Sequence, residues 1–484
     1  MTSNFTPADD RRRWIALGVL CLGVLMIVLD TTIINVALPS IRAALEFSET
    51  SLVWVVNAYM LTFGGFLLLG GRLGDLYGQR RLFLAGLTVF TLASAACGLA
   101  GSQQMLIAAR AVQGLGGAVV SAVALSLIMG LFRSESDRAR AMGVYGFVCA
   151  GGGSLGVLLG GLLTDLLSWH WIFLVNLPIG AAVFALCLAL LPDDRPPVRG
   201  ARLDYAGAIA VTTALMLAVY AIVGGNERGW TAPPTLALLA AAVLLAALFL
   251  VIEARVGAPL MPLGLFRLRN VTVANVVGML WAAAMFAMFF ISALYLQQVL
   301  GYSPMQVGLA FLPSNLIMAA FSLGISARIV MRFGIRAALA AGLAVAAFGL
   351  ALFARAPLHG DYLVDVFPGM ALIGLGAGTA LNPLLLAAMS DVEPGESGLA
   401  SGVVNTAFMM GGALGLAVLA SLAAAQTGAR LAGGVEPLVA LNDGYRLAFV
   451  IGAAFATAAA LISAFGVRPR RGAASRATGP APAA

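Results

Sequence analysis

Gly71-Arg72-Leu73-Gly74-Asp75-Leu76-Tyr77-Gly78-Gln79-Arg80-Arg81 connects two long apolar stretches, residues 52–70 and 82–100. Each stretch is long enough to cross a bilayer as a helix, which takes about 20 residues. The connection therefore lies at a membrane surface. Its three arginines place that surface in the cytoplasm, because basic residues are retained on that side. Its three glycines predict a tight turn, since glycine permits backbone conformations and close approaches that other residues do not.

The composition is that of an integral membrane protein. Of the 484 residues, 61% are hydrophobic and only 10% are charged, and the mean hydropathy is +0.98. Soluble domains carry about 25% charged residues. The net charge of +7 comes from 28 basic residues, all arginine. Membrane topology accounts for that charge better than nucleic-acid binding, so we expect no nucleic-acid partner. The four cysteines fall in apolar spans, where they act as small hydrophobes, so no metal site is expected.

Hydropathy and turn signals predict an all-α protein with fourteen membrane helices. These are expected near residues 14–38, 50–70, 82–101, 104–131, 140–166, 169–191, 204–224, 233–253, 270–300, 304–327, 336–355, 362–389, 397–426 and 445–466.

The arginines divide between the two sides of the membrane as this count requires. With both termini in the cytoplasm, 22 of the 28 arginines lie in cytoplasmic segments. The exceptions are Arg42, Arg110, Arg228, Arg355, Arg430 and Arg446. The segment 391–396 contains acids and no base, but acids contribute little to orientation.

Charged, proline-containing segments divide the chain into five parts. We expect a cytoplasmic N-terminus (1–13), a six-helix bundle (14–191), a linker with two inserted helices (192–269), a second six-helix bundle (270–466) and a disordered cytoplasmic tail (467–484).

Asp30 lies deep in the first expected helix, and Arg110 lies at a similar depth in the fourth. A charge at such a depth costs about 3 kcal/mol or more unless it is paired, hydrated or neutralised. An arginine favours the charged form of a nearby carboxyl group, whereas burial favours the neutral form. The two residues are therefore candidates for proton coupling, and a purely structural ion pair is the alternative.

The spacing Gly-x-Leu-x-Asp-x-x-Gly-x-Arg-Arg resembles the signature between helices 2 and 3 of the major facilitator superfamily of transporters. The similarity continues in residues 29–39, 54–59, 109–117, 151–161 and 397–405, and it resembles the fourteen-helix drug:proton antiporters in particular. It implies two helical halves that rock against each other, driven by a proton gradient without a cofactor. It assigns Asp30 and Arg110 to coupling. It assigns a conformational latch to Gly71, Arg72, Gly74, Asp75, Gly78, Arg80 and Arg81.

Residues 151–161 are rich in glycine, and we expect Gly152, Gly156, Gly160 and Gly161 to allow close helix packing. The stretch departs from the antiporter pattern at Val157, where a proline is usual. A dinucleotide fingerprint there lacks the preceding strand that it requires. Ser154 matches a serine-hydrolase motif, but the only histidines, His170 and His359, are expected near outer helix ends.

Adaptable apolar groups and uncharged polar groups within spans are candidates for cargo binding. They are Asn57, Gln113, Trp281, Met285, Phe289, Gln297, Asn382 and Asn405. Packing against lipid or hydrogen bonding between helices is the alternative for each.

These observations predict a monomeric exporter of lipophilic drugs or antibiotics in the inner (plasma) membrane, with no catalytic residues. Without a lysine the chain has no phosphate-binding loop, so ATP is not expected to drive it. The alternatives are uptake or metabolite export by the same fold, and a membrane-embedded hydrolase using Ser154.

Reporter fusions test the orientation. Fusions at residues 1, 75, 198 and 475 should report a cytoplasmic location, and fusions at 228 and 435 an external one, because of the arginine distribution. A cytoplasmic signal at residue 228 would rule out the two inserted helices.

Overall fold

The computed structural model describes residues 7–132, 135–191, 204–257, 259–390, 392 and 397–468. The side chains of a few helical residues, among them Asp75 and Ser154, are not included in that description. The expected disordered tail, except for its first two residues, and most of the segment before the inserted helices lie outside these ranges.

The described residues form helices and connections only. The long helices are α1 (Pro7–Leu45), α2 (Glu49–Tyr77), α3 (Gln79–Gly98), α4 (Gln103–Leu131), α5 (Glu135–Leu166), α7 (Asn176–Leu190), α8 (Tyr205–Arg228), α9 (Pro233–Arg255), α10 (Arg269–Leu294), α11 (Pro304–Ala320), α12 (Ser326–Phe353), α13 (Phe367–Met389), α14 (Ser397–Ala432) and α15 (Pro437–Gly466). The short ones are α6 (Trp171–Leu174), a 3-10 turn (Leu263–Arg267) and three π-turns (Tyr295–Val299, Phe321–Ile325 and Tyr362–Val366).

Twelve helical segments in the described chain are long and apolar enough to cross a membrane. The predicted number of fourteen is therefore not confirmed. The two remaining predicted spans fall on α5 and α11, whose apolar parts, Gly151–Leu166 and Pro304–Ala320, are shorter. The first half of α5 carries charged residues, and α11 passes into a π-turn after Ala320.

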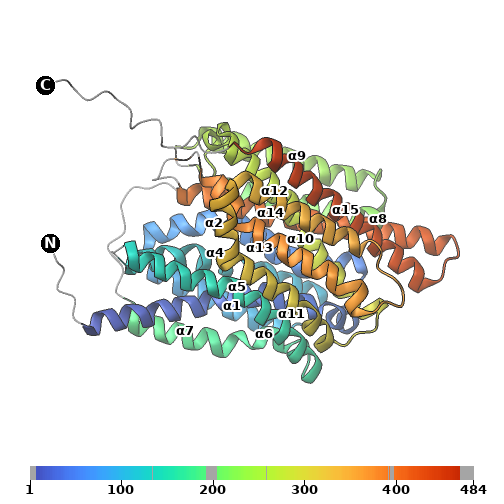
Figure 1. Ribbon diagram of the computed structural model, residues 1–484, viewed down its shortest axis with the longest axis horizontal. Coiled ribbons are helices and arrows are strands. Elements are labelled where there is room, and N and C mark those ends of the chain that lie inside the picture. Colours follow the sequence, from blue (N-terminus) through green and yellow to red (C-terminus); the bar gives the residue numbers. More distant parts are fainter. Residues whose placement is uncertain are drawn as a thin grey trace.

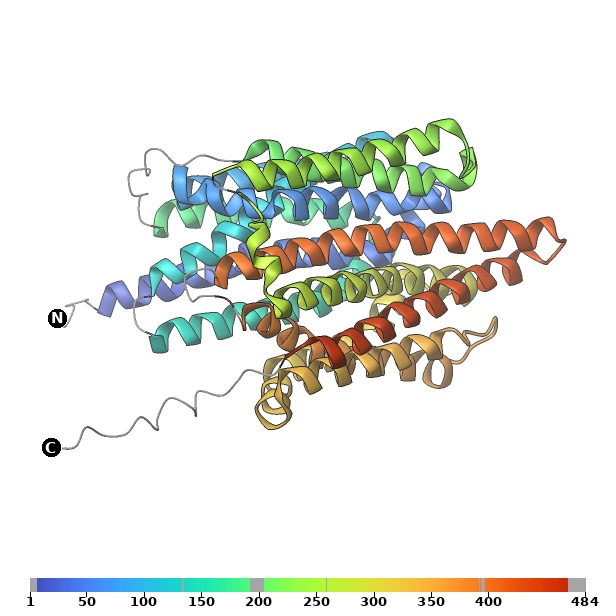
Figure 2. The same cartoon turned by 90° about the horizontal axis from the view of Figure 1, so that it is seen from above.

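The long helices form two groups with a helical pair beside them. In the first group α1 packs on α5 and α7, and α4 packs on α2 and α3; in the second, α10 packs on α14 and α15, and α12 on α13 and α15. The groups meet where α5 contacts α11 and α2 contacts α14 (Figure 1). The pair α8–α9 runs as a hairpin along one edge (Figure 2), and α8 contacts both α2 and α14.

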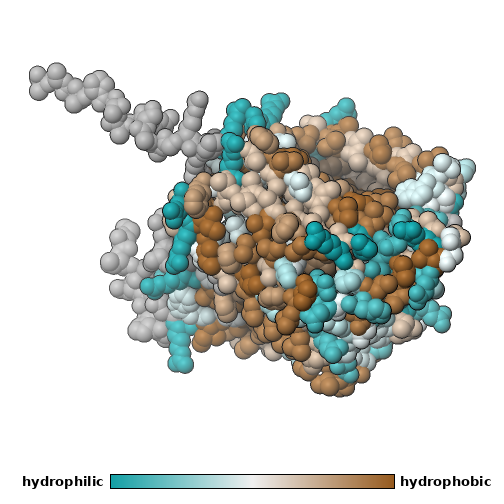
Figure 3. Space-filling model, turned by 45° about the vertical axis from the view of Figure 1, so that its right-hand side comes forward, coloured by the Kyte–Doolittle hydropathy of each residue, from teal (hydrophilic) through white to brown (hydrophobic). Residues whose placement is uncertain are grey.

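The start of α1 and the end of α15 lie at one end of the molecule, which we call the terminal end; the other is the far end (Figure 2). Hydrophilic residues gather near the terminal segments and again toward the far end, and a largely hydrophobic surface lies between them (Figure 3). This distribution suits a bilayer crossed by the long helices, whose lipid-facing surface must be apolar.

The glycine-rich connection differs from the expected turn. Helix α2 continues through Tyr77, and α3 begins at Gln79, so the turn is the single residue Gly78 with φ +101°. Gly71 and Gly74 are helical. At Gly74 an added Cβ would lie 3.0 Å from Cγ2 of Val123 on α4, so this glycine permits close helix packing. Of the close approach and the turn expected of these glycines, Gly74 therefore shows the close approach and Gly78 the turn.

The four expected packing glycines of α5 lie at close contacts with neighbouring helices. An added Cβ would lie 2.9 Å from Leu25 at Gly152, 2.0 Å from Oγ1 of Thr32 at Gly156, and 2.6 Å from the carbonyl oxygen of Ile33 at Gly160. These three face α1. Gly161 faces α11, where its Cβ would lie 2.7 Å from the carbonyl oxygen of Pro304.

We predict that Gly160→Ala lowers the melting temperature of the purified protein, while Gly151→Ala does not. The added methyl group at position 160 meets backbone, and such overpacking costs about 1–3 kcal/mol. At position 151 it meets nothing within 4 Å. Alanine there should instead add helix propensity, worth about 1 kcal/mol. Equal melting temperatures for the two variants would contradict the α1–α5 contact.

Candidate functional site

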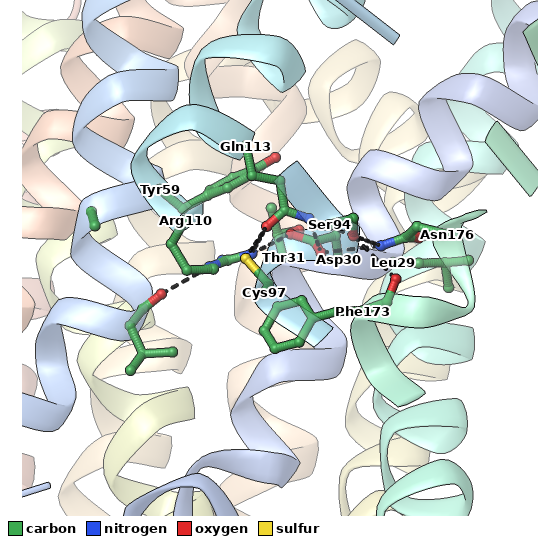
Figure 4. Close-up of polar contacts among 12 residues, drawn as sticks. Leu29, Asp30, Thr31, Tyr59, Ser94, Cys97, Arg110, Gln113, Phe173 and Asn176 are labelled. Atoms are coloured by element: carbon green, nitrogen blue, oxygen red, sulfur yellow. Dashed lines mark hydrogen bonds and ion pairs between the residues drawn. The ribbon is translucent and has the colours of Figure 1, made fainter. Parts of the chain in front are cut away.

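Asp30 and Arg110 form an ion pair inside the first helical group. Asp30 lies in the middle of α1 and Arg110 in the first half of α4. Nη1 of Arg110 lies 2.5 Å from Oδ2 of Asp30, and their side chains are 1% and 0% exposed, respectively (Figure 4). The structure therefore brings together the two residues expected to couple protons.

Side-chain amides from α4 and α7 also bond Asp30, and a serine from α3 links the two amides. Nε2 of Gln113 donates to Oδ1 of Asp30 at 2.7 Å, and Nδ2 of Asn176 on α7 donates to the same oxygen at 3.3 Å. Both amides also donate to Oγ of Ser94 on α3, at 3.0 and 2.9 Å. Ser94 in turn donates to the carbonyl oxygen of Phe173 at 3.1 Å. Every group that contacts Asp30 is a donor, so this arrangement fits the ionised carboxylate.

Arg110 has partners besides Asp30. Its Nη1 donates to Oε1 of Gln113 at 2.7 Å, and its Nε donates to the carbonyl oxygen of Val55 on α2 at 2.9 Å. Its guanidinium carbon lies 4.4 Å from the centre of the Tyr59 ring, a cation–π contact. The guanidinium group therefore keeps hydrogen-bond acceptors and an aromatic face if Asp30 takes up a proton.

Sequence reasoning missed Ser94, Asn176 and Tyr59 as members of this site. Ser94 and Asn176 are 0% and 1% exposed, although both are polar residues inside apolar spans. That combination was the available signal, because a buried polar group requires a partner. Which partner it has depends on the rotation of each helix.

The expected latch residues are spread along the terminal ends of α2 and α3. Nη2 of Arg72 donates to the carbonyl oxygen of Pro259 at 2.5 Å, and Nη2 of Arg80 donates to that of Leu188 at 2.8 Å. Arg81 is exposed at the start of α3. The side chain of Asp75 lies outside the described residues, so its part in a latch stays a prediction.

The eight cargo candidates have different surroundings in the structure, and their role in cargo binding stays a prediction. Asn57 donates to the carbonyl oxygen of Ala413, Gln297 to that of Val36 and Asn382 to that of Ser322, at 2.9, 2.9 and 2.7 Å. Gln113 belongs to the ion-pair network. Trp281 is buried, Met285 and Phe289 are partly buried, and Asn405 is exposed.

A polar cluster joins the two helical groups at the far end. Nη1 of Arg42 donates to Oε1 of Glu49 and to Oε1 of Gln298, both at 3.1 Å. The Tyr445 hydroxyl group donates to the same Gln298 oxygen at 3.0 Å. We call Arg42, Glu49, Gln298 and Tyr445 the far-end clamp. Within it, the hydrogen bond from Arg42 to Gln298 is charge-assisted and crosses between the two groups, in addition to the contact between α5 and α11.

Comparisons with known proteins agree with one another. The Major Facilitator Superfamily model matches residues 20–416. Puromycin resistance protein pur8 of Streptomyces alboniger is 40% identical over 459 residues, 94% of this chain and 90% of that protein. Cephamycin export protein CmcT of Amycolatopsis lactamdurans is 41% identical over 415 residues, 85% of each. A solved structure of an auto-inhibited POT family peptide transporter matches with a TM-score of 0.67 at 16% identity, over 94% of this chain and 96% of that one. At 16% sequence identity, this structural match shows a shared fold and carries no conclusion about function.

We predict that Arg110→Met destabilises the protein more than the double variant Asp30→Asn/Arg110→Met. Removing one partner of a buried ion pair costs about 3–5 kcal/mol, because the other charge stays buried without compensation. Removing both charges should recover most of the melting temperature of the purified protein. Additive losses in the double variant would mean that the two charges are not coupled.

Proposed function

This chain belongs to the Major Facilitator Superfamily, and on that premise we propose that it exports lipophilic antibiotics or other drugs in exchange for protons. The buried Asp30–Arg110 network carries the proposal, because a titratable group inside a membrane span is a candidate proton carrier. The puromycin and cephamycin proteins support the class of cargo.

The proposal includes fourteen membrane crossings, with both termini in the cytoplasm of a plasma-membrane protein that functions as a monomer. The twelve long apolar helices supply twelve crossings, and α5 and α11 supply the others. Helices α1–α7 and α10–α15 then form the bundles 14–191 and 270–466, and α8–α9 is the pair inserted within 192–269. The arginine distribution supports this orientation.

In this orientation the far end is external, and the conformation described here is closed on the outside. The far-end clamp and the contact between Gly161 and Pro304 hold the two bundles together there. Releasing the cargo outside requires these contacts to separate while the terminal ends approach. Asp75, Arg72, Arg80 and Arg81 would then act as a latch at the terminal end.

In this proposal, protons are coupled to the conformation because a proton and Arg110 compete for the Asp30 carboxylate. The ionised Asp30 holds Arg110, Gln113 and Asn176. A proton on Asp30 removes the charge, weakens the pull on Arg110, and leaves that residue bonded to Gln113 and Val55. Because these groups belong to α1, α2, α4 and α7, the change in charge alters how four helices are held together.

The chain is a transporter and not an enzyme, as its family and its relatives show. The hydrolase alternative for Ser154 is therefore set aside. Uptake by the same fold is the remaining alternative. Transport in everted vesicles separates it from export, because the cytoplasmic face is then outermost.

We predict that Asp30→Asn binds dye but that its pH-gradient-driven dye transport in everted vesicles falls by about tenfold or more. The reason is that position 30 no longer carries a carboxyl group that can take up a proton. Arg110→Ala should be at least as damaging. Asp165→Asn, which changes an exposed carboxylate in α5, is the matched control and should behave as wild type.

Normal uphill efflux by Asp30→Asn would make Asp365 the next candidate. Asp365 is a weaker candidate because its Oδ2 accepts a hydrogen bond from the backbone of Asp361 at a helix start. Equilibrium dye binding to the purified protein distinguishes a loss of coupling from a loss of cargo binding.

A further inference from the structure

A cavity of about 300 Å³ lies where the inserted pair meets both bundles. Its walls come from α2, α8, α9, α10 and α14 and from the segment that leads from α9 to α10. Apolar side chains line most of it, among them Leu68, Leu215, Phe249, Met261 and Met410. None of the eight cargo candidates belongs to its lining. The volume is at the lower end of the range for small-molecule sites, about 300–1,000 Å³.

Two buried polar atoms in the lining have no hydrogen-bond partner among the described residues. They are Oδ1 of Asn275 on α10 and Oγ1 of Thr406 on α14, in residues that are 4% and 8% exposed. Nδ2 of Asn275 donates to the carbonyl oxygen of Val271 at 2.9 Å. The unpaired atom of the side-chain amide is therefore its oxygen, Oδ1. A buried acceptor without a donor costs about 1–3 kcal/mol.

The hydroxyl group of Thr406, like those of the buried helical residues Thr164 and Thr235, makes no hydrogen bond among the described residues, and of these three threonines Thr406 lines this cavity. Thr62, Thr212 and Thr379 each donate to the carbonyl oxygen four residues earlier, at 3.0, 2.7 and 2.8 Å. The Thr406 hydroxyl group does not. A threonine inside a helix ordinarily satisfies its hydroxyl group in this local way. The hydroxyl group of Thr406 is therefore available to an occupant of the cavity.

The packing of α10 on α14 places the two polar groups at a similar height along the cavity. Gly411 of α14 faces Met279 of α10, and Gly415 faces Ala283, one turn further along both helices. The same register sets Asn275 level with Ala407, the neighbour of Thr406. The cavity thus combines an apolar volume with one polar corner, which suits a lipophilic molecule with a hydrogen-bond donor.

We propose that this cavity is a cargo site, which binds a lipophilic small molecule through an N–H or O–H group donated to Asn275. The identification of the occupant as cargo rests on the proposed function. The walls include α2 from the first bundle and α10 and α14 from the second, with Leu68 on α2 against Gly402 on α14. A movement of the bundles therefore changes the cavity, so its occupant stabilises the conformation described here.

The test uses two probes of nearly equal size, 4-phenylphenol with one O–H donor and 4-fluorobiphenyl with none. Binding to the full-length protein in lipid nanodiscs is measured against empty nanodiscs, which corrects for partition into lipid. We expect the phenol to bind about tenfold more tightly, a difference of 1.4 kcal/mol. Thr406→Val and Asn275→Leu should each remove most of that advantage and change fluorobiphenyl binding by less than about twofold.

Two further variants separate binding in the cavity from general effects. Ala407→Phe fills the cavity and should abolish the binding of both probes. Thr379→Val removes a buried hydroxyl group from α13 outside the cavity and should leave both affinities unchanged. Thr406→Val is nearly isosteric with the wild type, so it remains informative if Ala407→Phe does not fold.

Equal affinity for the two probes in the wild type, or unchanged binding by Ala407→Phe, would overturn the proposal. So would native mass spectrometry that finds a phospholipid lost only in Ala407→Phe, because the cavity would then hold lipid. These assays do not need transport. Efflux without probe binding would refute this cargo site alone, and probe binding without efflux would refute the proposed export.

Discussion

The buried ion pair of Asp30 and Arg110 is the interaction on which the first bundle depends. Moving two charges out of water costs several kcal/mol per ion, and a single contact does not offset that cost. Gln113, Ser94, Asn176 and the backbone of Val55 supply the additional hydrogen bonds. Because these groups lie on α1, α2, α3, α4 and α7, the need to satisfy one charge pair sets the relative depth and rotation of five helices.

The contact between the bundles has a different physical character. In lipid the helices gain little from burying apolar surface against each other. Their contact is stabilised instead by the close packing that small residues permit. Gly160 lets α5 approach α1, and Gly161 and Gly308 let α5 and α11 meet backbone to backbone at the far end. Backbone surfaces without interlocking side chains can separate without repacking a core. The far-end clamp then adds polar contacts that are readily exchanged for water.

The inserted pair is held at both ends. Toward the far end, Nδ2 of Asn226 on α8 donates to the carbonyl oxygen and to the hydroxyl group of Ser421 on α14, at 2.6 and 3.0 Å. Toward the terminal end, Nη2 of Arg72 on α2 donates to the carbonyl oxygen of Pro259, in the segment that follows α9, at 2.5 Å. Held in this way, α8 and α9 cover the junction of α2 with α14. They enclose the apolar cavity there, which the two bundles alone would leave open to lipid.

Local patterns in the sequence determined the membrane class, the approximate limits of most helices, the buried pair Asp30 and Arg110, and the close-packing role of the glycines in α5. These depend on hydropathy and on spacing along one helix. The tertiary structure decided that α2 continues through Gly71 and Gly74, that Ser94, Asn176 and Tyr59 join the ion pair, and that Asn275 and Thr406 share a cavity. Each of these depends on the rotation and register of two or more helices. A hydropathy pattern cannot specify them, because a helix that is apolar on every side has no face marked for its partner.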